Sequence, residues 1–344
     1  MNPTFNSVCS FESLLRAYRR ARRASPKSHD TLAFGWHLEK NLLQLRDELM
    51  NGQYRHGAYR EFVVEDAKKR HIKAASFRDR VVHHAICSAL EPIFERRFIG
   101  DSYACRAGKG THAALRRLEV WLRRGDDPYV LSCDISKYFA SINHENLMML
   151  IASRVSDSQL VSLCRSVVES TEDAPGRGIP IGNLTSQLFA NVYLDALDHH
   201  AKRVLGIRRY IRYMDDFLIF GKDTASLHET KARIVAFLGS RLGLVLHPKK
   251  ANVFPVVVGV PFLGYRVFRS HRLLRKSTVM RFARRVRQYK LLLASGDMEP
   301  EAFFAGMRSW SAYADDAASS GLKRSLAGRL GISFAPFISF QTAL

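Results

Sequence analysis

Cysteines and long apolar segments are both scarce in this chain. Its five cysteines are widely spaced and form neither a C-x-x-C pair nor a zinc-knuckle pattern, which argues against a disulfide framework and a structural zinc site. No segment reaches the ~20 apolar residues of a membrane span, and the amino terminus lacks the apolar stretch of a signal peptide. We therefore expect a cytoplasmic protein that has no membrane partner.

Acidic residues are few in comparison with basic ones. The 344 residues include 53 Lys and Arg against 32 Asp and Glu, which gives a formal net charge of +21. The usual partner of such an excess is a polyanion, so we expect a nucleic acid. A solvated basic surface and binding to an anionic membrane are the alternatives. Because 47% of the residues are hydrophobic, the chain should fold.

The first 60 residues favour two amphipathic helices. Apolar residues recur at helical spacing from Phe11 to Tyr18 among basic ones, before the breaker run SPKSHD, and leucines from Leu38 to Leu49 mark the second helix. Beyond them, EFVVED predicts a strand, the basic residues up to Arg70 a loop, and FRDRVVHHAICSALEPIFERRF a helix. We interpret the pair His83-His84 in that helix as structural histidines.

Carboxylates stand at the ends of two later strand candidates. YVLSCDI predicts a buried strand that ends near Asp134, and RYIRYMDDFLIFG places apolar runs on both sides of Asp215 and Asp216, which is typical of a hairpin. The glycine-rich segment GRGIPIGNLTSQLFANVYLDAL passes from a loop into a helix. LMMLIASRV, LVSLCRSVVES and LHETKARIVAFLGSRLG favour helices, and LVLHP, NVFPVVV and FLGYRVF favour strands. A basic helical region is expected from Ser277 onward.

These aspartates have the chemistry of a metal site. Adjacent aspartates are common in turns, but apolar strands on both sides would hold Asp215 and Asp216 at a packed sheet, where like charges repel unless a cation neutralises them. Transfer of nucleotides needs two divalent ions, and Mg²⁺ prefers oxygen ligands. We therefore predict that Asp134, Asp215 and Asp216 bind two Mg²⁺ ions, with Mn²⁺ as a substitute.

The chain resembles reverse transcriptases between about residues 61 and 277. Tyr213-Met214-Asp215-Asp216 matches the family's YxDD box, and LSCDISKYF matches its first aspartate motif. The motifs follow the family's order: RHIKAASFRDRVVHHAI, DSYACRAGKGTHAAL, LSCDISKYFASI, GIPIGNLTSQLFANVYLD, RYMDDFLIF, LGLVLHPKK and FLGYRVF. The resemblance implies an RNA-directed DNA polymerase that uses template RNA, an RNA/cDNA duplex and dNTPs.

The resemblance also implies roles for single residues. Asp134 and Asp215 would ligate the metal ions, Asp216 would complete the acidic site, and the backbone carbonyl of Ile135 would assist. Lys250 would protonate the departing pyrophosphate, and Lys249 is the alternative. FLGYRVF resembles the primer grip.

Several other positions would contact the incoming nucleotide. Phe139 would exclude a ribose 2′-hydroxyl as a steric gate, with core packing as the alternative. Arg70 would grip the triphosphate, for which a planar donor fork is suited. The remaining candidates for this contact are Ile181 and Gln187, and weaker ones are Lys68, Lys69 and Arg80.

One departure from the family pattern indicates a subfamily. Intron-type and retroviral enzymes usually have Gln-Gly after the proline of the glycine-rich motif, whereas Ile181-Gly182 follows Pro180 here. This form resembles the reverse transcriptases of diversity-generating retroelements, within the group II intron-like bacterial superfamily. That resemblance implies a bacterial or phage-encoded enzyme, error-prone copying at template adenines, mutagenic retrohoming and a small basic helical accessory protein. A packing role for Ile181 is the alternative.

The expected fold is an α+β right-hand polymerase. The resemblance implies a basic helical extension in residues 1–60 and fingers in residues 61–126 with part of residues 142–182. The palm would comprise residues 127–270, with an antiparallel sheet and packed helices, and an α-helical thumb residues 271–344. The alternatives for function are a reverse transcriptase of a retron or of phage defence, and a catalytically silent RNA-binding scaffold.

Overall fold

The computed structural model of the chain describes residues 3–65, 69–171 and 174–334. It divides into two compact units, one of Met1–Ala114 with Leu131–Val253 and one of Leu115–Val130 with Phe254–Leu344. Helices and antiparallel strand pairs occur in both units, so the expected α+β class is confirmed. The four-part division into extension, fingers, palm and thumb stays a prediction.

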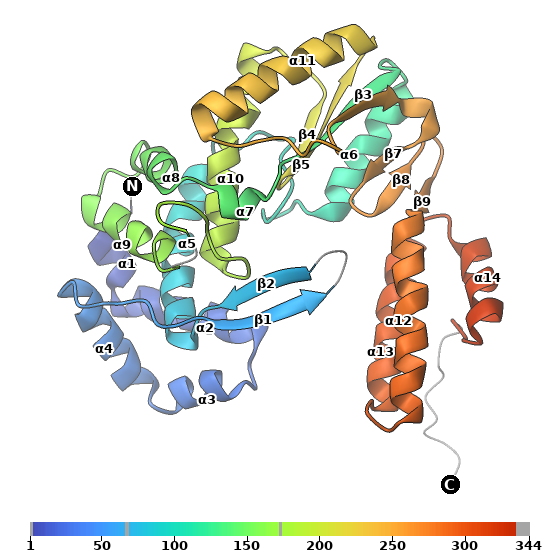
Figure 1. Cartoon of the computed structure of the whole chain (residues 1–344). Helices are drawn as coiled ribbons and strands as arrows, with labels where there is room; N and C mark the ends of the chain where they lie inside the picture. Colours follow the sequence, from blue (N-terminus) through green and yellow to red (C-terminus); the bar gives the residue numbers. More distant parts are fainter. Residues whose placement is uncertain (1–2, 66–68, 172–173, 335–344) are drawn as a thin grey trace. The chain divides into compact units, whose positions relative to one another are not determined.

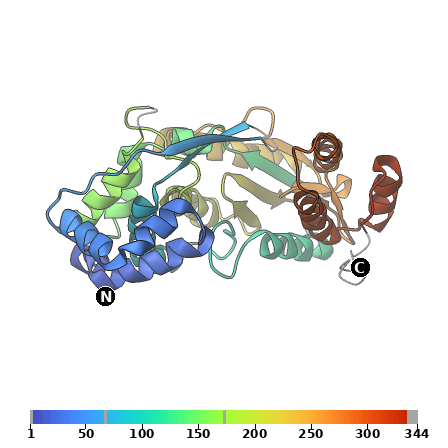
Figure 2. The same cartoon turned by 90° about the horizontal axis from the view of Figure 1, so that it is seen from below.

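Four helices at the amino terminus gather beside the long helix α5 of the first unit (Figure 1 and Figure 2). Both predicted helices of this region are confirmed, as α2 and α4. The run SPKSHD was expected to break the helix throughout, but its last residues begin a further helix, α3. The side chain of Ser28 caps this helix by accepting a hydrogen bond from the Thr31 amide. The bounds are α1 Phe5–Cys9, α2 Phe11–Ala24, α3 His29–Trp36, α4 Leu38–Met50 and α5 Phe77–Glu95.

A two-stranded hairpin precedes α5. The predicted strand is β1 (Arg60–Glu65), and it pairs antiparallel with β2 (Lys69–Ala74), where Val64 lies opposite Arg70. The loop predicted at Lys69 and Arg70 is therefore wrong. Ladder hydrogen bonds come from the backbone, so β2 can form although its first residues are charged and exposed, without an apolar pattern that would have revealed it.

The central sheet of the first unit has the strand order β4-β5-β3-β6. The predicted hairpin is confirmed as β4 and β5, with Tyr213 opposite Asp216. Helix α10 is joined to β4 by hydrogen bonds from Tyr210 and Arg212, and helix α11 packs against β5. The bounds are β3 Tyr129–Asp134, β4 Tyr210–Tyr213, β5 Asp216–Gly221, β6 Asn252–Pro255, α10 Leu184–His199 and α11 Thr224–Phe237.

Three more helices belong to the first unit: α7 (Tyr138–Ser141), α8 (His144–Ala152) and α9 (Ser158–Val168). Helix α6 (Thr111–Arg124) begins in the first unit, and most of its residues belong to the second. The helices expected in LMMLIASRV and LVSLCRSVVES are confirmed as α8 and α9.

Two strand predictions in this region are wrong in part. Within LVLHP only Leu246 pairs, as an isolated bridge to Ile135, because left-handed Gly243 comes before this run and Pro248 has no amide to donate. In NVFPVVV, strand β6 ends at Pro255 and a 3₁₀ turn, Val256–Val258, follows.

Residues 254–334 of the second unit form a three-stranded sheet and the helices α12, α13 and α14. A two-residue turn joins β7 to β8, and both of its residues, Leu263 and Gly264, have positive φ angles of 48° and 89°. A Cβ atom on Gly264 would lie 2.2 Å from the Tyr313 hydroxyl, so only glycine fits this turn. The bounds are β7 Val260–Phe262, β8 Tyr265–Val267, β9 Arg272–Leu274, α12 Lys276–Ala294, α13 Pro300–Asp315 and α14 Ser320–Leu330.

Helices α12, α13 and α14 share a small apolar core. Trp310 stacks on Phe282 with a ring separation of 3.7 Å and packs against that core. Across residues 3–65, 69–171 and 174–334, no helix has both the length and the apolar character needed to cross a membrane.

Candidate active site

The three predicted carboxylates lie at neighbouring strand ends of the central sheet. Asp134 ends β3, Asp215 stands in the turn between β4 and β5, and Asp216 begins β5. Strands β3 and β5 are adjacent, and the Ile135 amide donates a hydrogen bond of 3.2 Å to the Asp215 carbonyl. The fold thus joins two segments that are far apart in the sequence.

A lysine contacts the first of these carboxylates. The Nζ atom of Lys250 lies 2.5 Å from Oδ2 of Asp134, and the Asp134 side chain is only 16% exposed. The preceding segment runs along the end of β3, since the His247 amide donates to the Asp134 carbonyl and the Ser136 amide donates to Val245. This pairing brings Lys250, a predicted proton donor, to the site.

The charge of Asp216 also acts on β3. Burial raises the pKa of the Cys133 thiol to about 12, Lys231 opposes this rise, and the negative charge of Asp216 adds to it. Because Cys133 directly precedes Asp134, the end of β3 has two carboxylates close to it: Asp134 on β3 itself and Asp216 on the adjacent strand β5.

The donor set matches a hard divalent cation, but the side chains do not converge around one. Among the described residues, no three Asp, Glu, His or Cys side chains form a group that could hold a metal ion. Like-charged carboxylates separate unless a cation lies between them, and the cation beside Asp134 is the Lys250 ammonium group. Carboxylate oxygens at adjacent strand ends are nevertheless the ligands that Mg²⁺ prefers.

The predicted steric gate, Phe139, lies in the short helix α7 just after β3. The neighbouring Tyr138 is buried, and its hydroxyl donates to the Ala190 carbonyl of α10 at 2.5 Å. The Ile179 amide donates to the Phe139 carbonyl at 3.0 Å. The glycine-rich segment therefore lies against α7, and Phe139 itself stays half-buried.

The same glycine-rich segment is bound on its other side to the β1–β2 hairpin. The Lys73 amide donates to the Ile181 carbonyl at 3.0 Å. The buried side chain of Asn183 accepts from the Ala75 amide at 3.1 Å and donates to the Lys73 carbonyl at 2.9 Å. Ile181 is thus fixed through its backbone to the strand that carries Arg70, and its own side chain is half-buried.

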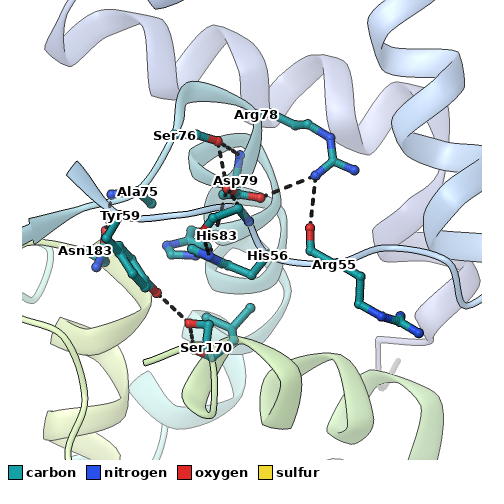
Figure 3. Close-up of polar contacts among 12 residues, drawn as sticks. Arg55, His56, Tyr59, Ala75, Ser76, Arg78, Asp79, His83, Ser170 and Asn183 are labelled. Carbon is teal, nitrogen blue, oxygen red and sulfur yellow. Dashed lines mark hydrogen bonds and ion pairs between the residues drawn. The ribbon is translucent and has the colours of Figure 1, made fainter. Parts of the chain in front are cut away.

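The side chains of His56 and His83 connect the segment before β1 to α5 (Figure 3). A hydrogen bond between His83 and Thr185 extends this connection to α10. The Nδ1 atom of His56 lies 2.7 Å from the Gly57 carbonyl, which can only accept, so this nitrogen is the protonated one. In a neutral His56, Nε2 then accepts from His83 Nε2 at 3.2 Å, and His83 Nδ1 accepts from the Thr185 hydroxyl at 3.3 Å. The interpretation of His83 as a structural histidine is therefore confirmed.

Burial and, to a lesser degree, the neighbouring His56 lower the pKa of His83 to about 3. Asp79 opposes this effect, and His84 and Arg80 add to it. Asp79 itself accepts hydrogen bonds from Tyr54, Ser76 and the Gly57 amide, so donors surround its carboxylate. The result is a neutral His83 beside a carboxylate that accepts several hydrogen bonds.

The other nucleotide-binding candidates lie in different surroundings. Arg70 is exposed on β2, and Gln187 is half-buried in the first turns of α10. The guanidinium group of Arg80 instead donates to the Ala21 carbonyl of α2 at 3.0 Å and lies over the Phe77 ring. Arg80 therefore connects α5 to the amino-terminal helices. Lys68 lies outside the described residues.

The YxDD turn is supported by polar residues that the sequence analysis missed. Arg212 is fully buried, its guanidinium group binds Asp198 through two hydrogen bonds, and it also donates to Asn191. Two signals could have revealed them: a charged residue on an apolar strand, and polar residues 191, 195 and 198 at helical spacing on α10.

Carboxylates at adjacent strand ends, in a strongly basic chain, are typical of enzymes that transfer nucleotides. A family model described as reverse transcriptase (RNA-dependent DNA polymerase) matches residues 65–267. Because this match spans more than half of the chain, the chain belongs to the reverse transcriptase family. It is therefore a nucleotidyltransferase, an RNA-directed DNA polymerase. The family uses a nucleic-acid template, dNTPs and divalent metal ions.

Curated relatives agree with this assignment. Protein YkfC of Escherichia coli is 27% identical over 66% of this chain and 71% of its own length. The group II intron-encoded protein LtrA of Lactococcus lactis is 22% identical over 70% of this chain and 52% of its own length. Nuclear intron maturase 4 of Arabidopsis thaliana is 32% identical over 41% of this chain. The matched part is only 18% of that maturase, so the chain spans a small part of some relatives.

Solved structures with distant similarity include apo telomerase from Candida tropicalis, at 12% identity and a TM-score of 0.46 over 64% of this chain and 47% of that one. A partial Cas6-RT-Cas1–Cas2 complex matches at 18% identity and a TM-score of 0.40, over 69% of this chain and 42% of that one.

Proposed function

We propose that this chain copies an RNA template into cDNA by two-metal nucleotidyl transfer at Asp134, Asp215 and Asp216. One observation carries the proposal: the hydrogen bond between the Ile135 amide and the Asp215 carbonyl, which joins the two strand ends that bear the carboxylates. Two Mg²⁺ ions, when bound, would activate the primer 3′-hydroxyl and neutralise the departing pyrophosphate. Mn²⁺ would substitute for them.

Lys250 has two tasks in this proposal. Its ammonium group neutralises Asp134 until the carboxylate is needed as a ligand, and it is then available as the proton donor for pyrophosphate. The contact between Lys250 and Asp134 supports this choice over Lys249, which is exposed. The backbone carbonyl of Ile135 would complete the ligand set.

The incoming dNTP would lie between the hairpin and α7. Phe139 would exclude the 2′-hydroxyl of a ribonucleotide, Arg70 would bind the triphosphate, and Gln187 would contact the nucleotide. The glycine-rich segment supports this arrangement, because its backbone is bonded to Phe139 on one side and to Lys73 on the other. The contact of Arg80 with the Ala21 carbonyl favours a structural role for that arginine.

We further propose an error-prone enzyme of the diversity-generating type, which works with a small basic helical accessory protein. The supporting feature is Ile181, which replaces a polar side chain and so removes a hydrogen-bonding contact near the nascent base pair. Exposed arginines of α2, among them Arg16, Arg19 and Arg23, offer a docking surface for the nucleic acid or the accessory protein.

The experiment is primer extension on a defined RNA template with dNTPs and Mg²⁺. The wild-type chain should extend the primer, and Asp215→Asn should lower the rate by about a thousandfold or more. Asp223→Asn is the matched control, since this exposed residue caps α11 and asparagine caps equally well. Equal extension by wild type and Asp215→Asn would contradict the role of Asp215, and no extension by the wild-type chain would favour the catalytically silent RNA-binding scaffold.

Sequencing of the same cDNA tests the finer claims. Errors should occur mostly opposite template adenines, and Ile181→Gln should reduce them. A uniform error spectrum would favour a retron- or defence-type enzyme. In the same assay, Phe139→Val should raise ribonucleotide incorporation by roughly 10- to 100-fold. Unchanged discrimination between the two sugars would mean that Phe139 has only a packing role.

A further inference from the structure

The backbone of the YxDD turn has an unusual conformation for its sequence. Two residues, Met214 and Asp215, join β4 to β5, because Tyr213 pairs directly with Asp216. Met214 has a φ angle of 55°. Hairpin turns with a positive φ at their first central residue favour glycine there, and a side chain at such a position is held only where its surroundings enforce it.

The side chain of Arg212 supplies such a contact. Its Nη1 atom donates to the Met214 carbonyl at 3.2 Å and to Oδ1 of Asn191 at 3.1 Å. The guanidinium group thus binds the backbone of the turn, two residues beyond its own position. The carbonyl that it holds belongs to the peptide unit whose nitrogen is that of Asp215.

Arg212 is itself held by a buried carboxylate. Its Nε and Nη2 atoms donate to the two oxygens of Asp198 at 2.7 and 2.6 Å, and both side chains are fully buried. The Tyr210 hydroxyl donates to the same carboxylate at 2.7 Å. Burial alone would lower the pKa of Arg212, but Asp198 raises it above its ordinary value, so the guanidinium group stays charged.

The backbone of Arg212 is fixed as well. Its amide donates to the Asp101 carbonyl at 2.9 Å, and its carbonyl accepts from the Tyr103 amide at 3.0 Å. Residues 101–103 therefore lie along the edge of β4 that faces away from β5. With its backbone bound to this segment and its side chain bound to α10, Arg212 is a rigid support for the turn.

We propose that Arg212, oriented by Asp198, is a positioning residue that keeps the Met214–Asp215 turn in the conformation that presents Asp215 to the divalent metal ions. The inference rests on the proposed function. Arg212 therefore has two roles. Its ion pair with Asp198 stabilises the protein, whereas its hydrogen bond to the Met214 carbonyl orients Asp215 as a metal ligand.

A double-mutant cycle tests this role. Arg212→Lys keeps the buried charge but cannot replace the planar donor fork, so kcat for primer extension should fall roughly 10- to 100-fold, as expected for a misplaced catalytic group. The KM for dNTP should change little. Met214→Gly removes the conformational restriction on the turn, so the same Arg212→Lys change should cost much less kcat in the Met214→Gly chain.

Metal binding gives a readout that does not need turnover. Titration with Mn²⁺, followed by electron paramagnetic resonance of the free ion, should show weaker binding by Arg212→Lys than by wild type. Asp198→Asn keeps one of the two acceptor oxygens that bind Arg212, so it should show a smaller defect in the same direction. Far-UV circular dichroism checks that each variant is folded.

Arg97→Gln is the matched control, since Arg97, like Arg212, pairs with a carboxylate of α10, that of Asp195, at 3.4 Å. It should leave kcat and Mn²⁺ binding unchanged. The inference is overturned if folded Arg212→Lys binds Mn²⁺ and extends primers like wild type, or if its loss of kcat is the same with Met214 and with Gly at position 214. Failure of the proposed function differs, because the wild-type chain itself would then not extend primers.

Discussion

Two clusters in the first unit bury an ionisable side chain, and they differ in whether that side chain keeps its charge. Beneath the YxDD turn, Arg212 stays charged because Asp198 binds it through two hydrogen bonds. At the start of the hairpin, His83 is equally buried but loses its charge, since its pKa falls to about 3. A buried group can thus be paired or neutralised, and only the neutralised one makes folding depend on pH near neutrality.

The largest effect is expected when the charged cluster loses one partner. Arg212→Met would leave Asp198 buried and unpaired, which should lower the free energy of unfolding by about 3–5 kcal/mol. Arg212→Met with Asp198→Leu should recover most of that loss, because no charge stays behind. Urea unfolding of the three chains measures this. Equal stability of the single and double variants would show that the pair is not electrostatically coupled.

The neutral cluster should respond to acid instead. Unfolded His83 would titrate near its ordinary pKa of 6.5 and the folded side chain near 3, so the unfolded state binds more protons between these values. The contribution of His83 to stability is therefore complete above about pH 6.5 and declines as the pH falls towards 3. Between pH 7 and pH 5 the loss should be about 2 kcal/mol, and His83→Gln should remove it.

Chemical denaturation at a series of pH values provides this measurement. The control is the same exchange at an exposed histidine of helix α6, His112→Gln. An unchanged slope of stability against pH in His83→Gln would contradict the neutral state of this histidine.

The smallest effect should come from the hydroxyl group that completes the neutral cluster. Thr185→Val keeps the shape of the side chain but leaves Nδ1 of buried His83 without its donor, which should cost about 1–2 kcal/mol. Because the histidine stays neutral, the pH slope should not change. Urea unfolding at pH 7 and pH 5 separates the two quantities, and a changed slope would mean that Thr185 controls the protonation state.

Much of the fold could be predicted from local patterns. Apolar runs on both sides of Asp215 and Asp216 were sufficient to predict β4 and β5, and leucine spacing was sufficient for α4. Strand β2 was missed because its side chains are mostly charged or polar and its stability comes from backbone pairing with β1. Helix α3 was missed because a capping serine stands in a run of turn-forming residues.

The candidate site shows the same division. Motifs identified Asp134, Asp215 and Lys250, and the structure joins the segments that carry them. What the sequence could not show is which contacts these side chains make: that of Lys250 with Asp134, that of Arg80 with α2, and that of Arg212 with the Met214 carbonyl. Each depends on which face of an element its neighbours cover, and no local pattern contains that information.

Binding of Mn²⁺ to the purified chain, measured by electron paramagnetic resonance, tests the central claim most directly: that Asp134, Asp215 and Asp216 close around divalent ions in exchange for Lys250. Asp134→Asn should weaken binding by about tenfold or more, and Lys250→Gln should strengthen it, because the competing ammonium group is gone. Identical Mn²⁺ binding by the wild type and both variants would contradict the account.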